Sequence, residues 1–545
     1  MTEAPWWQRA VGYQIWPRSF QDSNGDGIGD LPGIISRLDH LADLGVGFVW
    51  LSPAYASPQA DMGYDISDYR DIAPEYGTLD DMDRLIAEAG KRDIGIVMDL
   101  VVNHSSDKHH WFEAARSDRN APERNYYVWA DPDEDGKPPS DLRACFGGPA
   151  WNWCERAQQY YLGYFSPFQP DLNWRNPALR AEIWDMMNWW FDRGIAGFRM
   201  DVISLIGKDV ENEVFEEGPF LHDYLQEMHR ETLRGRDVVT IGESWSVSRE
   251  TAPLYCAKDR DELSMVFQFN HIKSQWDDIH GKWKPKPFDL VSFKEELFGW
   301  QTALADEGWN SLFLSNHDLP RQVSKYGDDG EYRERSAKTL ATITHLMKGT
   351  PFIYQGEEIG MTNIRLSRLD QFRDLEAIGL WHEEHERGVE WETFLAGANE
   401  NGRDNSRTPV QWDDSDSAGF TTGHPWIEVN DNYRTVNIAA ERAREDGILA
   451  HYRALVGLRR DRDIVAFGRF EAAAEDHPQV VAYQRRFRDE RLVVVANMTG
   501  EDVRFDAPHS LHISGEGILT TVEPREVIDG AVTLAPWESF AIHER

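Results

Sequence analysis

The sequence predicts an α/β protein: a (β/α)8 TIM barrel with a small domain inserted after strand 3 and a C-terminal antiparallel β domain. Three observations lead to this fold class. Short β-rich runs alternate with amphipathic helical segments through the first two thirds of the chain, as parallel βα units require. One connection between two of these runs is far longer than an ordinary loop. The last part of the chain instead alternates apolar and polar residues, as antiparallel strands do.

Eight runs have the composition of barrel strands, and eight is the number of parallel strands that closes a βα sheet on itself. The segments 31–45 and 79–93 place apolar residues at helical spacing after the first two strands. An open doubly wound sheet is the competing fold, but no glycine-rich dinucleotide fingerprint follows the first strand. Polar residues gather directly after the strand ends, where barrel enzymes place their active sites. The predicted strands are residues 11–16, 46–51, 94–102, 195–203, 238–244, 264–269, 311–316 and 351–357.

The breaks in this pattern predict three domains. The barrel is expected over residues 1–103 and 174–463. Residues 104–173, rich in Asp, Pro, Trp and Tyr, are expected to form a small domain over the mouth of the barrel. A second excursion, at about 361–433, follows the eighth strand before a helical pattern closes the barrel. Alternating runs predict a C-terminal β domain over residues 464–545.

Composition excludes several classes of partner. The net charge of −37, from 57 basic and 94 acidic residues, argues against nucleic-acid and anionic-membrane partners. The chain has neither a membrane-spanning apolar run nor a secretory signal pattern. Its three cysteines are too few and too irregular for a disulfide framework or a zinc site. We therefore expect a soluble cytoplasmic protein, monomer or homodimer, that acts on a small neutral molecule.

Four strand ends carry acids or histidines where the chain leaves the barrel core: residues 99–104, 197–205, 241–245 and 314–318. A buried carboxylate is costly unless it is paired or hydrogen-bonded, so packing alone explains such a set poorly. Separate structural salt bridges are the alternative, and for Asp99, which lies earlier in its strand, they are as good an explanation as a site. The set as a whole predicts a catalytic site at the mouth of the barrel.

These four segments, in this order on a βα pattern, resemble the four signature regions of the α-amylase superfamily of glycoside hydrolases (family 13). QPDLNW at 169–174 is similar to a further region of that family just before the fourth strand. The resemblance is closest to the oligo-1,6-glucosidase and α-glucosidase group, through MGYDISDY at 62–69, TPFIYQGEEIGMTN at 350–363 and GRDNSRTPVQW at 402–412. It covers the whole chain and implies the three-domain layout of the family.

The resemblance implies three catalytic carboxylates. Asp201 matches the nucleophile, Glu243 the acid/base, and Asp318 the third acid, which grips sugar hydroxyls and favours the transition state. A retaining glycosidase holds its nucleophile and acid about 5 Å apart across the glycosidic bond. Arg199 lies two residues before Asp201, so we expect its charge to keep Asp201 ionised. Glu243 is conversely expected to be held protonated by desolvation and nearby negative charge.

Further residues are implied to bind the sugar. The pocket for the terminal glucose is expected to contain Asp61 beside a stacking aromatic, with Arg403 as the partner of that acid; Arg407 in the same motif is the alternative. Two histidines beside the acids match the hydroxyl-binding histidines of the family. For Phe165, as for Phe146, plain packing is an equally good explanation. The implied substrate-binding residues are Asp61, Tyr64, His104, Arg199, His317, Arg403, Phe165 and Val202.

A valine directly after the nucleophile, here Val202, tends in this group to accompany activity on α-1,6 bonds, whereas α-1,4-specific relatives carry a smaller or hydroxylated residue. A stiff β-branched side chain there reshapes the space for the second sugar. The resemblance thus predicts a retaining exo-α-glucosidase, an oligo-1,6-glucosidase. It would hydrolyse terminal α-1,6 bonds of isomaltose, isomalto-oligosaccharides or panose through a covalent glucosyl-enzyme intermediate.

Other activities share this mechanism, because a sugar hydroxyl can intercept the covalent intermediate as water does. They are an α-1,4-glucosidase, a sucrose- or trehalose-active hydrolase, an isomerase and a transglucosidase. A non-catalytic relative, such as the heavy subunit of an amino-acid transporter, belongs to a different class. That reading requires a membrane segment and broken acids, and the sequence has neither.

The stretch DSNGDGIGD at 22–30 matches the first nine positions of an EF-hand calcium loop. The twelfth position is Gly33 instead of a bidentate Glu, and a strand-like run precedes the loop, so a calcium sensor is excluded. A metal-free acidic turn is the simpler alternative. The oligo-1,6-glucosidase group holds a structural cation in the matching loop. The resemblance therefore implies that this loop binds Ca²⁺, or Mg²⁺, with waters completing the coordination shell. The expected ligands are Asp22, Asn24, Asp26, the carbonyl of Ile28, and Asp30.

Overall fold

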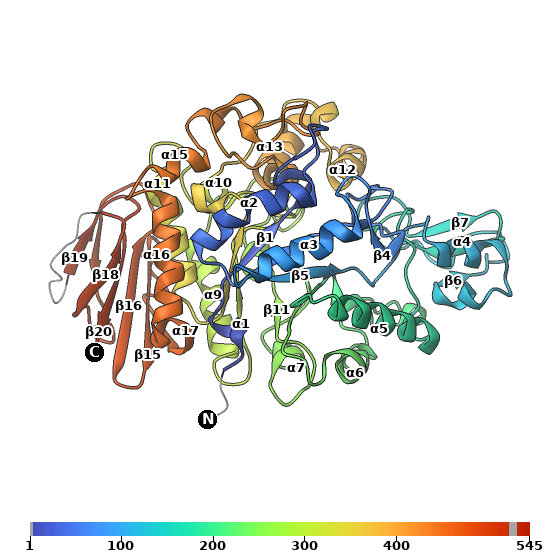
Figure 1. The fold of residues 1–545 in the computed structure, drawn as a ribbon, viewed down its shortest axis with the longest axis horizontal. Coiled ribbons are helices and arrows are strands. Elements are labelled where there is room, and N and C mark those ends of the chain that lie inside the picture. The colour runs from blue at the N-terminus through green and yellow to red at the C-terminus, as the bar shows by residue number, and fades with distance from the viewer. Residues whose placement is uncertain (1–3, 523–530) are drawn as a thin grey trace.

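Eight parallel strands form the centre of the computed structural model, which describes residues 4–522 and 531–545 (Figure 1). They are β1 (Gly12–Ile15), β2 (Phe48–Leu51), β5 (Gly95–Leu100), β9 (Gly197–Met200), β10 (Val239–Glu243), β11 (Met265–Phe267), β12 (Ser311–Leu312) and β13 (Thr350–Tyr354). Their order is β11-β10-β9-β5-β2-β1-β13-β12, and a parallel bridge between Val266 and Asn310 joins the two ends. Each run expected from the sequence contains one of these strands, so the predicted barrel is confirmed.

The barrel strands are buried along their length, as in parallel sheets covered by helices. A close approach at the start of β1 requires glycine. A Cβ on Gly12 would lie 2.6 Å from the ring of Phe48 and 2.8 Å from the ring of Phe352. Those two rings contact each other edge to face, with centroids 5.7 Å apart. They pack across β1 at the N-terminal end of the strands, opposite the end that carries the acids.

Amphipathic helices surround the barrel, and their ends follow local sequence signals. The first, α2 (Leu31–Leu44), begins at Asp30, whose side chain accepts the Gly33 N–H, and ends at Gly45 with φ 87°. The second, α3 (Leu79–Gly90), begins with a capping box between Thr78 and Asp81. Both match the predicted helical segments. The other helices around the barrel are α5 (Pro177–Asp192), α6 (Leu221–Met228), α7 (Ala252–Cys256), α8 (Asn270–Lys273), α9 (Leu290–Ala303), α10 (Gln322–Tyr326), α11 (Arg333–His345) and α16 (Ile448–Asp461).

The long connection between β5 and α5 forms a small unit of its own at one end of the molecule (Figure 1). It contains α4 (His110–Ser117) and a three-stranded antiparallel sheet in the order β6 (Trp129–Ala130), β8 (Gln159–Leu162), β7 (Trp151–Cys154). An antiparallel bridge from His104 to Asp171 holds its two ends together, and a second bridge, from Tyr127 to Leu172, ties its C-terminal end to the interior of the unit. This is the small domain expected after strand 3, and we keep 104–173 as its proposed limits.

The excursion after β13 is helical and has a hydrophobic cluster of its own around Phe394. It touches the inserted domain directly: Glu383 pairs with Arg143 and accepts the Gly148 N–H at 2.7 Å. Two loops distant in sequence are thereby joined across the open end of the barrel. The helices of the excursion are α12 (Leu375–Glu386), α13 (Trp391–Asn401) and α14 (Asp404–Arg407), and α15 (Ile438–Arg442) follows it.

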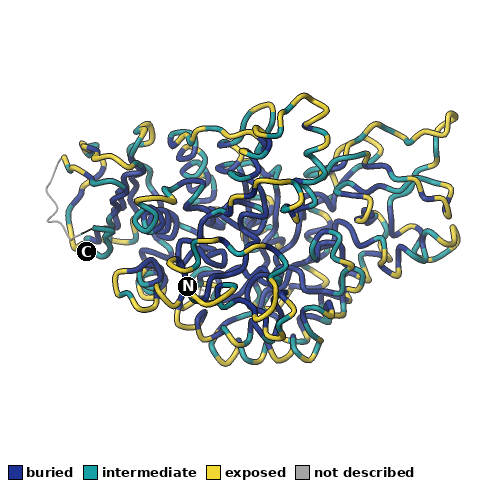
Figure 2. Tube along the Cα trace, turned by 90° about the horizontal axis from the view of Figure 1, so that it is seen from above, coloured by how far each residue is buried: buried dark blue, intermediate teal, exposed yellow. Residues whose placement is uncertain are grey.

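The C-terminal sheet lies at the opposite end of the molecule from the inserted domain (Figure 1). Its antiparallel order is β14 (Arg469–Ala473), β15 (Val480–Phe487), β16 (Glu490–Asn497), β20 (Ser539–Glu544) and β18 (Glu516–Thr520), with β17 (Val503–Asp506) paired to β19 (Ala531–Leu534). It docks on the barrel helices through Tyr483, which donates to the Ile343 carbonyl, and Thr339, which donates to the Trp537 carbonyl. Figure 2 shows the buried chain concentrated in the barrel and in this junction. The expected C-terminal antiparallel domain is confirmed.

Candidate active site

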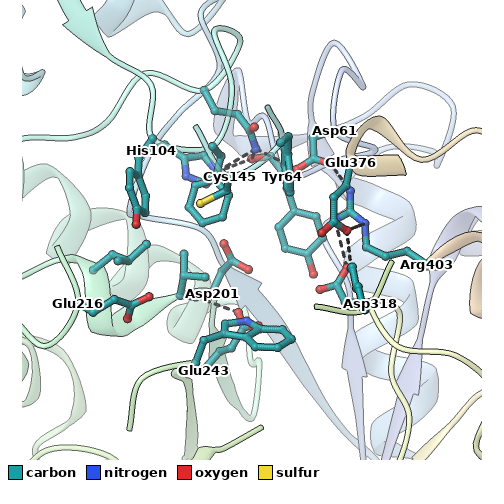
Figure 3. Close-up of a pocket in the computed structure, with 18 of the residues that line it drawn as sticks. Asp61, Tyr64, His104, Cys145, Asp201, Glu216, Glu243, Asp318, Glu376 and Arg403 are labelled. Atoms are coloured by element: carbon teal, nitrogen blue, oxygen red, sulfur yellow. Dashed lines mark hydrogen bonds and ion pairs between the residues drawn. The ribbon is translucent and has the colours of Figure 1, made fainter. Parts of the chain in front are cut away.

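A cavity of about 390 Å³ opens at the C-terminal ends of the barrel strands (Figure 3). Strand ends, the inserted domain and the helical excursion all contribute side chains to it. The sequence-predicted acids and most of the predicted sugar-binding residues therefore lie in one place. Among the lining residues are Asp61, Tyr64, His104, Cys145, Asp201, Glu216, Glu243, Asp318, Glu376 and Arg403.

Asp201 and Glu243 leave neighbouring strands side by side. Glu243 is the last residue of β10, Asp201 follows β9, and the register pairs Met200 with Gly242, so the two carboxylates come level. Arg199 joins them, because its Nη1 lies 2.8 Å from Asp201 Oδ1 and its Nη2 lies 2.6 Å from Glu243 Oε2. Adjacent strands run about 4.8 Å apart. This spacing suits the short carboxylate separation of a retaining glycosidase.

Glu243 is held through both oxygens. The Val202 N–H donates to Oε2 at 3.0 Å, and the Trp245 indole N–H donates to Oε1 at 3.0 Å. Val202 reaches this position with φ 36° and ψ 44°, the left-handed region that β-branched residues rarely adopt. Backbone strain is thus placed directly beside the acid, where the surrounding packing maintains it.

The electrostatics of Asp201 differ from the sequence-based expectation. Burial raises the pKa of Asp201 well above its ordinary range, Arg199 lowers it, and the negative charges of Glu243, Asp99 and Asp318 raise it further. The expected ion pair with Arg199 is present, but burial among like charges outweighs a single guanidinium, so the expected direction was wrong. The carboxylates around Arg199 therefore retain a proton as a group.

Asp99 completes this charged cluster from β5. Its Oδ1 lies 2.8 Å from Arg199 Nη1, and its Oδ2 accepts the Trp50 indole N–H at 3.0 Å and the Tyr64 hydroxyl at 3.1 Å. Arg199 and Asp99 are 1% and 0% exposed. The sequence left Asp99 open between a site residue and a separate salt bridge. The structure places it as the partner that orients Arg199.

The pKa of Asp318, which follows β12, is shifted in the opposite direction to that of Asp201. His317 Nε2 lies 3.1 Å from its Oδ2, while Arg407 Nη2 and Arg403 Nη1 lie 2.9 Å and 3.3 Å from its Oδ1. Burial by itself would raise the pKa of Asp318, but the hydrogen-bonding contact with His317 and the charges of Arg403 and Arg407 outweigh burial and hold that pKa well below its usual range. Asp318 is therefore a permanent anion on the side of the cavity away from Glu243 (Figure 3).

The geometry separates the two candidate partners of Asp61. Arg403 Nη2 lies 3.6 Å from Asp61 Oδ1, whereas Arg407 pairs with Asp318. Gln169, in the quoted segment before strand 4, also donates to Asp61 at 3.0 Å and was not expected as a site residue. Burial raises the pKa of Asp61 to about 7, although Arg403 acts to lower it.

Two acids of the helical excursion hold the guanidinium of Arg403 in place. Its Nε lies 2.9 Å from Asp374 Oδ1 and 3.3 Å from Glu376 Oε2, and Lys282 Nζ lies 2.6 Å from Glu376. Asp374 caps α12 and Glu376 lies in its first turn. These residues were not expected from the sequence, because nothing in the α12 segment itself indicates that the helix lies over the barrel mouth.

The predicted histidines lie beside the acids. His104 Nε2 is 3.0 Å from the Tyr64 carbonyl, and burial lowers the pKa of His104 to about 4, so it is neutral. The Tyr64 hydroxyl is 2.7 Å from His317 Nε2, and the two rings are nearly parallel, at 8°. Tyr64 therefore links the histidine beside Asp318 to the Asp99 carboxylate, to which its hydroxyl donates.

Aromatic side chains line the outer part of the cavity. Phe165 packs 5.2 Å from the His104 ring, and Phe146 lies 4.8 Å beneath the guanidinium of Arg403. Both line the cavity, as does Val202. Trp245 adds a flat surface and stacks on Phe269 with ring centroids 3.8 Å apart.

Glu216 is a further acid of the cavity wall that the sequence did not signal. Its Oε2 accepts the hydroxyls of Ser204 and Ser246 at 2.8 Å each. It lies on the loop after β9, near Asp201 and across the cavity from Asp318 (Figure 3). Glu216 and Glu376 are thus two further acids among the residues that line the cavity.

The loop at 22–30 is folded by its own side chains. Asp22 Oδ1 accepts the Asn24 N–H at 2.8 Å, and Asn24 and Asp26 accept N–H groups two residues further on at 2.9 Å and 2.8 Å. Asp30 caps α2. Among the described residues, no three His, Cys, Asp or Glu are grouped to hold a metal. The carboxylates of the loop can hold a cation only if the amide oxygen of Asn24 and the carbonyl oxygen of Ile28 also bind it. Each of these two oxygens has a second lone pair with which to do so. Cation binding here stays a prediction.

The fold and the cavity together define the class: an enzyme-type barrel with paired carboxylates at its strand ends, suited to glycosidic bonds. The family model for the α-amylase catalytic domain matches residues 14–468. A palatinase of Erwinia rhapontici is 50% identical over 99% of each chain, and an oligo-1,6-glucosidase of Halalkalibacterium halodurans is 47% identical over 98% of each. The crystal structure of a trehalose-6-phosphate hydrolase of Bacillus licheniformis is 41% identical, with a TM-score of 0.94 over 99% of this chain and 100% of that one. The chain belongs to the α-amylase family (family 13) of glycoside hydrolases.

Within the described part of the chain, no helix combines the length and the apolar character needed to cross a bilayer.

Proposed function

We propose that the protein is a retaining, exo-acting α-glucosidase that hydrolyses the terminal α-1,6 bond of isomaltose, isomalto-oligosaccharides and similar disaccharides. The observation that carries this proposal is the placement of Asp201 and Glu243 on one guanidinium, that of Arg199, at adjacent strand ends. Two carboxylates that share one cation at adjacent strand ends can supply the nucleophile and the acid that covalent glycosidase chemistry requires.

The proposed reaction has two steps. In the first, a carboxylate oxygen of Asp201 bonds to the anomeric carbon while Glu243 gives its proton to the departing glycosidic oxygen, and the bond between that oxygen and the carbon breaks. In the second, Glu243 takes a proton from water, whose oxygen bonds to the same carbon and releases Asp201. Arg199 stays bonded to both carboxylates as negative charge moves from Asp201 to Glu243 and back.

The size and burial of the cavity favour action at chain ends. Its volume of about 390 Å³ lies near the lower end of the range for ligand pockets, about 300–1,000 Å³. Asp61, Arg403 and His104 are each less than 9% exposed and offer hydrogen-bonding groups at one end of it. A buried polar end of this kind suits a single terminal ring whose hydroxyls replace the lost water.

Two observations favour α-1,6 bonds. Val202 places a stiff β-branched side chain in the cavity wall beside Glu243. The relatives named above include an oligo-1,6-glucosidase and a palatinase. We therefore add palatinose to the proposed substrates.

A phosphorylated disaccharide, as in the name of the trehalose-6-phosphate hydrolase, is a weaker candidate. The cavity is lined by Glu216 and Glu376 beside the catalytic acids. Its Lys282 and Arg403 are both already paired with Glu376. A phosphate would meet repulsion from the acids and would have to displace an existing ion pair.

A substrate panel tests the proposal: initial rates on isomaltose, palatinose, maltose, sucrose, trehalose and trehalose 6-phosphate, with products identified. We expect kcat/KM to be largest for isomaltose or palatinose, with glucose released in the α-configuration. Maltose cleavage without isomaltose cleavage would reject the linkage, and conversion of sucrose to an isomer would reject hydrolysis as the main activity.

We also propose that one Ca²⁺, or Mg²⁺, is held by the 22–30 loop, and that the enzyme works in the cytoplasm as a monomer or homodimer. The cation would stabilise the loop that leads into α2 and would take no part in the chemistry, since the loop lies apart from the catalytic carboxylates.

A further inference from the structure

A buried glutamine on the first barrel strand contacts a histidine of the site from behind. Gln14 lies in β1 and is 1% exposed. Its Nε2 is 2.7 Å from His317 Nδ1 and 3.1 Å from the Ser52 hydroxyl. Nothing in the reaction described above uses Gln14, yet a buried amide aimed at one ring nitrogen decides what that nitrogen can do.

The His317 ring is fixed in its plane and faces several charges. It lies nearly parallel to the rings of Trp16 and Tyr64, both with centroids 5.3 Å away, and meets Trp50 edge to face. The charged groups that face it are Asp318, Arg199 and Arg407. Burial lowers the pKa of His317, so near neutral pH it carries a single ring proton, which must lie on one of two nitrogens.

The neighbours of Nε2 decide between the two tautomers. Nε2 lies 3.1 Å from Asp318 Oδ2. Asp318 is an anion and can only accept, so a bare lone pair on Nε2 would face the carboxylate and be repelled. The proton therefore belongs on Nε2, which leaves Nδ1 as an acceptor in need of a donor. The Gln14 amide N–H lies at that position.

We propose that Gln14 is a positioning residue of the reaction: its amide holds His317 as the tautomer protonated on Nε2, and thereby orients Asp318 and Tyr64. The result is a chain of hydrogen bonds with defined donors: Gln14 donates to His317, and His317 donates to Asp318. Tyr64, in contact with Nε2 at 2.7 Å, donates to Asp99, which holds Arg199. The inference rests on the proposed glycosidase function for its kinetic readout, although the tautomer itself does not depend on it.

Two substitutions of similar size separate positioning from packing. Gln14→Met removes the donor, and kcat/KM on an aryl α-glucoside should fall about tenfold or more, by a similar factor at every pH. Gln14→Glu replaces the donor by an acceptor and favours a doubly protonated His317, which still donates to Asp318. This variant should therefore retain activity at low pH and lose it as the pH rises through the raised pKa of His317.

Gln301 offers a matched control. It is another buried glutamine, 1% exposed, whose amide bonds both main-chain groups of Lys348 at 2.9 Å, away from the cavity. Gln301→Met should lower the melting temperature and leave kcat/KM and its pH profile unchanged. If the two Gln14 variants have the same pH profile, or if Gln14→Met keeps kcat/KM within twofold, the residue only packs and the proposal is wrong.

A second measurement needs no substrate and reads the tautomer in the unmodified enzyme. In ¹⁵N-histidine-labelled protein, nitrogen shifts report which ring nitrogen carries the proton, and His317→Gln assigns the signal. We expect Nε2 of His317 to be protonated in the unmodified enzyme. A proton on Nδ1 would overturn the inference, whether or not the enzyme cleaves α-glucosides.

Discussion

The floor and the mouth of the cavity are built on different principles. The floor consists of Asp99, Arg199, Asp201 and Glu243, which come from β5, β9 and β10 or directly follow them. The mouth consists of residues from connections and the excursion: Phe146, Glu216, Lys282 and Glu376. Pairing between neighbouring strands fixes the positions of the floor residues relative to one another. The positions of the mouth residues depend instead on how the long loops pack against each other. Reaction chemistry is therefore expected to be a property of the barrel, and substrate choice a property of the loops.

The two regions also differ in charge balance. On the floor, three carboxylates contact one guanidinium, so the cluster is short of positive charge and retains a proton. In the mouth, Glu376 is paired with both Lys282 and Arg403. Changes in the floor should therefore act on turnover, and changes in the mouth on binding and selectivity.

The largest effect is expected for Asp201→Asn, which removes the proposed nucleophile from the floor. Turnover should fall about 10³-fold or more, since an amide cannot form the glycosyl ester. The variant should melt at the same or a higher temperature, because the raised pKa of Asp201 means that ionising it opposes folding above the ordinary carboxyl pKa. Steady-state kinetics and calorimetry measure both. Near-normal turnover in a folded variant would reject the assignment, and Asp192→Asn, at an exposed helix position, is the control.

The second prediction concerns Glu243→Gln, which leaves the proposed nucleophile in place but removes the proposed acid. Isomaltose, with its poor leaving group, should lose about 10²–10⁴-fold in kcat/KM. For an aryl α-glucoside, whose phenol leaves without protonation, kcat/KM for the step in which the leaving group departs should fall far less. Equal losses on the two substrates would show that Glu243 is not the acid. Glu262→Gln, a buried acid bonded to Arg260 and away from the cavity, controls for lost stability.

Arg403→Gln tests the boundary between floor and mouth. It should raise KM and lower kcat/KM about 10–100-fold, because Asp61 and Asp374 lose their cation. Arg403 lowers the pKa of Asp61, which is about 7, so its removal should raise that pKa and move the acidic limb of kcat/KM to higher pH. Breaking a buried pair should also cost about 3–5 kcal/mol of stability.

The control for Arg403 is Arg387→Gln on the exposed face of the excursion, whose side chain is 64% exposed. It should change neither KM nor the pH profile. A KM that stays constant in Arg403→Gln, with only the melting temperature lowered, would leave Arg403 as a structural residue.

Val202→Thr probes selectivity with little change in volume. The ratio of kcat/KM for isomaltose to that for maltose should fall about tenfold, within the range for small changes of fit. Turnover on the aryl glucoside should change little, because the Val202 N–H to Glu243 is a backbone contact. An unchanged ratio would assign linkage preference to other residues of the mouth.

The smallest effect is expected from removing the proposed cation. A chelator should lower the melting temperature by about 2–5 °C, through loss of ligand-linked stability. The isomaltose-to-maltose ratio should stay the same, because the 22–30 loop belongs to neither the floor nor the mouth. Asp26→Ala should melt at the chelated temperature with or without added Ca²⁺. If chelator leaves the melting temperature of the unmodified enzyme unchanged, the loop is a metal-free turn.

Much of the floor could be predicted from the sequence. Short β-rich runs and helical periodicity mark the barrel elements, and each proposed catalytic acid lies at the end of an apolar run, so its position on a strand end follows from local signals. Asp201 and Glu243 lie on consecutive strands that pair in parallel. Their meeting therefore follows once the barrel is accepted.

The balance of charge on the floor was harder to predict from the sequence. Arg199 was expected to keep Asp201 ionised, but the burial of Asp201 itself, together with the charges of three further acids around it, reverses the direction of the shift in pKa. Desolvation depends on everything that packs around a group, and no spacing in the sequence measures it.

The amino-acid order alone was sufficient for the barrel, its two excursions, the C-terminal sheet and the family resemblance, because these follow from local periodicity and short motifs. Only the tertiary structure placed Asp374, Glu376, Glu216 and Lys282 around the mouth, distinguished Arg403 from Arg407, and brought Gln14 behind His317. Those contacts join residues far apart in the chain. They are decided by how loops and strands pack in space, which no local pattern encodes.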